Sequence, residues 1–162
     1  MSTDSKALGK GTSAGWVKWL VVTLVLGVLA FLASPNAPLG GFWGAQAEGA
    51  APTGVQTLLF MILGAIQSLV FGLGIAFLIF GFSLTGARMP ANLGWARAAH
   101  FAIAWSLFSW WPHSNFHQTL VPDNISGLLA IEYGFHVTLI LAGLIVAYFF
   151  VTTMRPGAMP SQ

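Results

Sequence analysis

The chain of 162 residues is 56% hydrophobic and only 6% charged, with a formal net charge of +2. A soluble domain normally carries about a quarter charged residues, so this surface would be too apolar for water, and lipid must be part of its solvent. The chain has no cysteine, which excludes disulfides, thiolate metal sites, iron–sulfur clusters and a cysteine nucleophile. Its few basic residues form no nucleic-acid-binding patch, so we expect no nucleic-acid partner.

Apolar runs along the chain predict an all-α integral membrane protein, a four-helix bundle over residues 16–154. Runs of about 20 residues can cross the hydrocarbon layer as helices. Residues 1–15 are small and polar, which is typical of a disordered tail, and residues 155–162 form a second short tail. The four helices are expected at about 16–33, 55–83, 93–111 and 127–154.

The first apolar run has a competing interpretation as a secretory signal peptide. The run over 16–33 is only about 18 residues long, just enough to span a membrane. Ala45-Gln46-Ala47 resembles a small-residue cleavage site. That site lies far beyond the apolar run, and the polar leader is long, so an uncleaved helix is the preferred interpretation.

Local signals fix several helix ends. Thr53 and Gln56 have the spacing of a capping box, in which two side chains satisfy free backbone N–H groups at a helix start. Asn92 is suited to capping the third helix, and Asn124 is one of the residues suited to capping the fourth. Pro112 should end the third helix, because the residue before a proline is biased away from helical angles.

Small residues in the second predicted helix favour close contact with neighbouring helices. Gly72 and Ala76 stand four residues apart, a small-xxx-small spacing that lets helix backbones approach each other in lipid. We expect these positions to serve packing rather than ligand binding.

The basic residues predict the orientation in the membrane. With four crossings, all six fall on one side, and the loops 34–54 and 112–126 on the other side contain none. The positive-inside rule makes the basic side cytoplasmic. We therefore expect a plasma (inner) membrane protein with both termini in the cytoplasm and both of these loops extracytoplasmic. The six residues are Lys6, Lys10, Lys18, Arg88, Arg97 and Arg155.

The extracytoplasmic side gathers residues that can bind metals. His113 and His117 are four residues apart, as are Glu132 and His136, and this spacing places two side chains on one face of a helix. Asp123 lies between the two pairs. Together they offer up to five N and O ligands, a set suited to Zn or Cu. The competing interpretation is that these are ordinary interfacial residues and helix caps.

Glu132 requires a partner. It should lie roughly 8 Å inside the outer boundary, and the outer half of the predicted protein has no lysine or arginine. A histidine, a metal, a proton, a polar neighbour or another subunit must balance its charge. Ionisable residues inside a membrane are functional candidates for this reason.

A deeper polar layer is a second candidate site. His136, His100 and Gln67 are expected roughly 13–18 Å below the outer boundary, each on a different helix. His100 and His136 facing each other could be the axial ligands of a b-type haem, which needs no cysteine. Alternatively, His100 hydrogen-bonds to a neighbouring helix or faces the inner interface beside Arg97.

Three functions remain open from the sequence. The first is a small membrane subunit that binds a metal or haem and belongs to a larger complex, such as an electron-transfer complex. The second is a purely structural subunit that contacts lipid and other membrane subunits or a second copy of itself. The third is an oligomeric transporter or proton-path subunit whose path is lined by the buried polar residues. The small size argues against a stand-alone enzyme.

Overall fold

The computed structural model describes residues 10–44, 52–120 and 124–154, and all regular structure in these segments is helical. The all-α prediction is therefore confirmed for the described residues. Most of the expected tails, the Ala45-Gln46-Ala47 motif and Asp123 lie outside them. The elements are α1 (Lys10–Leu32), η1 (Gly40–Trp43), α2 (Gly54–Phe80), α3 (Phe82–Arg88), α4 (Leu93–Phe108), α5 (Trp110–Thr119), α6 (Ile125–Ile131), η2 (Glu132–Val137) and α7 (Thr138–Thr153).

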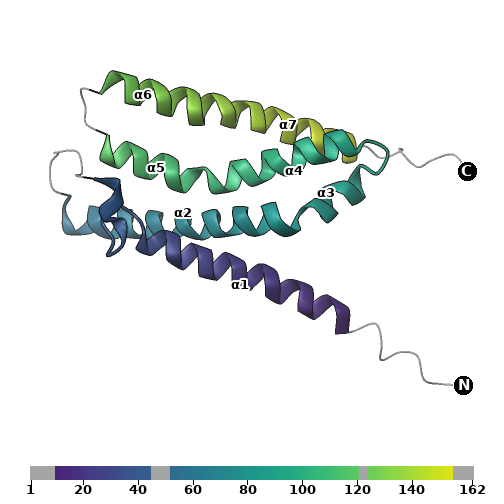
Figure 1. Cartoon of the computed structure of the whole chain (residues 1–162), viewed down its shortest axis with the longest axis horizontal. Coiled ribbons are helices and arrows are strands. Elements are labelled where there is room, and N and C mark those ends of the chain that lie inside the picture. Colours follow the sequence, from purple (N-terminus) through teal and green to yellow (C-terminus); the bar gives the residue numbers. More distant parts are fainter. Residues whose placement is uncertain (1–9, 45–51, 121–123, 155–162) are drawn as a thin grey trace, which may run out of the picture.

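Three helical segments are long and apolar enough to cross a membrane, namely Gly15–Leu32, Gly54–Phe80 and Ile125–Thr153. Their length and composition indicate a membrane protein. Helix α4 has 16 residues, which is short of the roughly 20 that a bilayer requires. It is followed almost directly by α5, and the two lie end to end in Figure 1. We refer to them together as the α4–α5 rod.

The continuation into α5 differs from the expectation that Pro112 ends the third helix. Ser109 keeps helical backbone angles, and the N–H of His113 donates to the Ser109 carbonyl at 3.1 Å. Pro112 stands third in α5. A proline is tolerated in the first turn of a helix, where its missing N–H has no intrahelical partner to lose. The third helix therefore ends at Phe108, before Pro112, and Pro112 lies inside the next helix.

The helices form an open row in Figure 1, and the four-helix bundle expected from the sequence is not confirmed. Each long helix packs mainly on the helices next to it in the chain. Helix α1 packs on α2, α2 packs on α4 and α5, and α4 packs on α7. Figure 1 shows the order directly, with α1 at one edge, α6 and α7 at the other, and α2 and the α4–α5 rod between them. Among the described residues, α1 and α7 thus lie at opposite edges.

Two glycines explain why α2 has a neighbour on each side. A Cβ atom at Gly72 would lie 2.2 Å from the Thr23 carbonyl oxygen of α1, and one at Gly74 would lie 2.6 Å from the Phe108 nitrogen of α4. Residues two apart on a helix point about 200° away from each other. The two close approaches are therefore on opposite faces of α2. Lipid provides no hydrophobic drive to close the row.

The predicted caps are confirmed. The Thr53 N–H donates to Oε1 of Gln56 at 2.8 Å, and the Gln56 N–H donates back to Thr53 Oγ1. Asn92 accepts from the Trp95 N–H at 3.2 Å, and Asn124 accepts from the Gly127 N–H at 2.8 Å.

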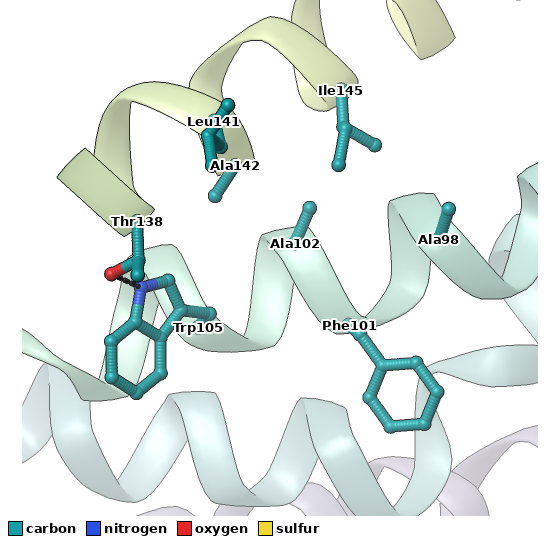
Figure 2. A pocket seen from close by; sticks show the side chains of 8 residues that line it. All are labelled: Ala98, Phe101, Ala102, Trp105, Thr138, Leu141, Ala142 and Ile145. Carbon is teal, nitrogen blue, oxygen red and sulfur yellow. Dashed lines mark hydrogen bonds between the residues drawn. The ribbon is translucent and has the colours of Figure 1, made fainter. Parts of the chain in front are cut away.

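A shallow apolar groove follows the contact between α4 and α7. Figure 2 shows the indole of Trp105 at one end, where its Nε1–H donates to Oγ1 of Thr138 at 2.9 Å. Farther along, Ala102 of α4 and Ile145 of α7 face the groove. The full lining is Ala98, Phe101, Ala102, Trp105, Thr138, Leu141, Ala142 and Ile145.

Candidate metal centre

Three imidazoles converge where α5 meets η2. His113 and His117 come from α5 and His136 comes from η2, and one ligand atom from each lies within 4.8 Å of the other two. The ring centroid of His113 is 4.7 Å from that of His117 and 4.7 Å from that of His136. We call this group the histidine cluster.

The α5 helix sets the first half of the cluster. Its helical backbone places His113 and His117 on one face, with their Nε2 atoms 3.1 Å apart. One ring N–H can donate to the other ring at this distance. It also suits a shared ion, because two ligands of a tetrahedral zinc with Zn–N bonds of about 2.0–2.1 Å are themselves about 3.3 Å apart.

A π-helical turn sets the second half. The segment η2 carries both Glu132 and His136, and the Glu132 N–H donates to the carbonyls of Leu128 and Leu129. A π turn places one more residue in a turn than an α-helix does, and such turns are frequent at functional sites. In this chain the turn directs His136 toward α5.

Glu132 contacts His136 and does not join the converging ligand atoms. Its Oε2 is 2.5 Å from Nδ1 of His136. Of the partners that the sequence allowed for this carboxylate, the structure shows the histidine. An Nδ1–H donated to a carboxylate leaves Nε2 of the same ring free to bind a metal. Carboxylate–histidine–metal arrangements of this kind orient the ring and raise its basicity.

Aromatic rings pack beside the cluster. The Phe135 ring lies 5.2 Å from that of His113 and is stacked on Trp105 at 5.8 Å. Phe116 is 6.0 Å from Phe135. These ring contacts link α5, η2 and α4 beside the cluster.

His100 belongs to a different place. It is buried, its Nε2 is 3.1 Å from the Leu78 carbonyl oxygen, and its ring stacks on Phe77. This agrees with the alternative in which His100 hydrogen-bonds to a neighbouring helix. At 1.5 Å per residue, His113 lies about 20 Å farther along the α4–α5 rod. His100 and His136 are therefore not brought together as two axial ligands of one haem.

Gln67 is the other predicted site residue that the structure describes. Gln67 is half-buried on α2, a helix that supplies no member of the histidine cluster. Asp123 lies outside the described residues. The nearest described cation along the rod is Arg97, about 24 Å from His113 at 1.5 Å per residue. No described lysine or arginine on this rod can therefore neutralise Glu132.

The sequence grouped the two i, i+4 pairs with Asp123 as up to five ligands of one site, and the structure brings three of these residues, His113, His117 and His136, together. His136 was expected deeper in the membrane, opposite His100, and the structure places its ring against His113. The signal in the sequence that linked the two pairs was their placement on the same, extracytoplasmic side of the predicted membrane domain.

Comparison with protein-family models, with curated proteins and with solved structures returns no match.

Proposed function

We propose that this chain is a four-span membrane subunit that holds one divalent transition metal ion, Zn²⁺ or Cu²⁺, through the histidine cluster. The observation that carries the proposal is the convergence of three imidazoles from two separate helical segments within 4.8 Å. Random interfacial histidines rarely meet in this way, because each ring must be aimed at one point.

The choice of metal follows from the ligands. Imidazole nitrogen suits Zn, Cu, Ni and Fe, and it does not suit Mg or Ca, which prefer oxygen. The chain has no cysteine, so soft thiolate ligation is excluded. Cu²⁺ binds nitrogen sites most tightly among the divalent first-row ions, and Zn²⁺ is the common ion in three-histidine sites.

The proposed topology counts the α4–α5 rod as the fourth crossing. Residues 93–119 at 1.5 Å per residue extend about 40 Å, enough for a bilayer with a hydrocarbon core of about 30 Å. With four crossings, every lysine and arginine lies on one side, which the positive-inside rule makes cytoplasmic. Both termini are then cytoplasmic, and the connection after α5 is extracytoplasmic.

The surroundings of the cluster support a role as one subunit of a larger membrane assembly. The side chains of His136 and Glu132 are 42% and 50% exposed, and charged or polar groups are costly against lipid tails. Water, lipid headgroups or a partner must therefore meet this face. The open row also leaves two helical edges for other membrane subunits or a second copy of the chain.

Metal analysis of the full-length protein tests the proposal. After gentle solubilisation, removal of metal and reloading, we expect one Zn²⁺ or Cu²⁺ per chain. His117→Ala and His136→Ala should each weaken binding by at least 100-fold. His100→Gln is the matched control, because it changes a histidine of the same rod outside the cluster, and it should bind as the wild type does. Equal binding by all three variants and the wild type would refute the metal site.

A further inference from the structure

The histidine cluster supplies three donor atoms to a metal. Within the described residues, the converging group consists of His113, His117 and His136 alone. Glu132 is engaged with Nδ1 of His136 on the side of that ring away from a metal bound at Nε2. Zinc and copper take at least four ligands, so three imidazoles leave at least one position for a group that the cluster does not provide.

The charge of the site indicates what that group is. Three neutral imidazoles and a divalent ion carry two positive charges, and the Glu132 carboxylate cancels one of them. One positive charge then remains, and the rod's nearest charged neighbour, Arg97, is itself a cation about 24 Å away. At this partly exposed face the remaining positive charge attracts anions. A single negative charge completes the site.

The exposed side chains give a ligand access to the cluster. His117 is exposed, and the side chains of His136 and Glu132 are partly exposed. A ligand can therefore reach the metal from the face that carries these three residues.

We propose, on the basis of the metal site proposed above, that the bound ion keeps one coordination position open for a small exchangeable monoanion. In water this ligand is hydroxide. It would form by loss of one proton from a bound water to solvent, because a divalent metal ion lowers the pKa of the water that it binds. The metal keeps its oxidation state in this step. Glu132 is then a positioning residue and not a metal ligand.

Azide is the probe for the open position. The full-length protein is loaded with Cu²⁺, freed of excess copper and titrated with sodium azide. We expect an azide-to-copper charge-transfer band that saturates at one azide per copper, together with a changed copper paramagnetic resonance spectrum that still shows nitrogen ligands. Chloride and cyanate should compete with azide. The variant that combines His113→Ala, His117→Ala and His136→Ala provides the baseline and should show no such band.

Two carboxylate variants make the result decisive. Azide could give no charge-transfer band with the copper-loaded wild type but a band with Asp123→Asn or Glu132→Gln. The carboxylate removed in that variant would then fill the position, and the inference would be wrong. If neither variant nor the wild type responds although copper is held by nitrogen ligands, the position is closed and the inference is also wrong. If the wild type retains no copper, the proposed metal site fails and this inference fails with it.

Discussion

Glu132 and His136 lie one turn apart on η2, and Oε2 of the glutamate is 2.5 Å from Nδ1 of the histidine. This contact fixes which ring nitrogen of His136 faces the glutamate, and it leaves Nε2 for the histidine cluster. Both residues are partly exposed, so the pair contributes little to stability by itself. Its importance lies in the orientation of the ring.

Replacing Glu132 by glutamine should therefore weaken metal binding without abolishing it. Loss of a carboxylate behind a metal-binding histidine typically costs about 10–100-fold in affinity. The dissociation constant for Zn²⁺, measured by competition with a chromophoric chelator, should rise by that factor. Tyr133→Phe, an exposed neighbour on the same turn, is the control and should leave the constant unchanged. An unaltered affinity in Glu132→Gln would show that the contact does not support the site.

Thiol labelling should place Ala91 and Gln118 on opposite sides of the membrane. The natural chain has no cysteine, so Ala91→Cys and Gln118→Cys each introduce a single reporter, before α4 and near the end of α5. A membrane-impermeant maleimide applied from outside should label Gln118→Cys in intact cells. It should label Ala91→Cys only after permeabilisation. Labelling of both from the same side would mean that the α4–α5 rod does not cross, and the four-span topology would be wrong.

Gly72→Ala should destabilise the contact between α1 and α2. The added Cβ would lie 2.2 Å from the Thr23 carbonyl oxygen and 2.7 Å from the Gly27 nitrogen, and neither backbone atom can move alone. We expect a loss of about 1–3 kcal/mol in the free energy of unfolding, as for other overpacked sites. Titration with a denaturing detergent, followed by tryptophan fluorescence, measures it.

Gly64→Ala is the matched control for Gly72→Ala. Gly64 lies in the same helix, and a Cβ there would meet nothing within 4 Å. Alanine has the higher helix propensity, so this variant should be as stable as the wild type or slightly more stable. If Gly72→Ala and Gly64→Ala unfold at the same detergent fraction, the close approach at Gly72 does not hold the two helices together.

The hydrogen bond between Trp105 and Thr138 should couple α4 to α7. Trp105→Phe keeps an aromatic ring beside Phe135 but removes the donor of the 2.9 Å bond, and Thr138→Val removes the acceptor. A double-mutant cycle on unfolding free energies should give a coupling of about 0.6 kcal/mol, with about 1.7 kcal/mol as the upper end for bonds between membrane helices. A coupling near zero would mean that the bond contributes nothing beyond packing.

Features that depend on a few consecutive residues were predictable from the sequence. The capping box of Thr53 and Gln56 and the cap at Asn92 need only the chemistry of one helix turn, and both are found. The pairing of Glu132 with His136 was predictable for the same reason, since residues four apart share a face of a helix. In each case the interacting groups are brought together by local backbone geometry alone.

Features that depend on the packing of distant segments were predictable only in part. Pro112 was expected to end a helix, but the helical angles at Ser109 carry the chain onward into α5. The π turn at η2 has no sequence signature comparable to a cap, yet it directs His136 toward α5. The histidine cluster needs both features together. The cluster therefore depends on how the α4–α5 rod packs against η2. The distance between these two segments cannot be worked out from the sequence of either one.

The open row of helices has a consequence for any movement of ions or protons. A conducting path needs a wall on every side, and in the described part of the chain the first and last rods stand at opposite edges. Such an arrangement encloses no interior of its own. A water-filled route involving this protein would have to run along a border with another molecule, which would supply the missing half of its lining.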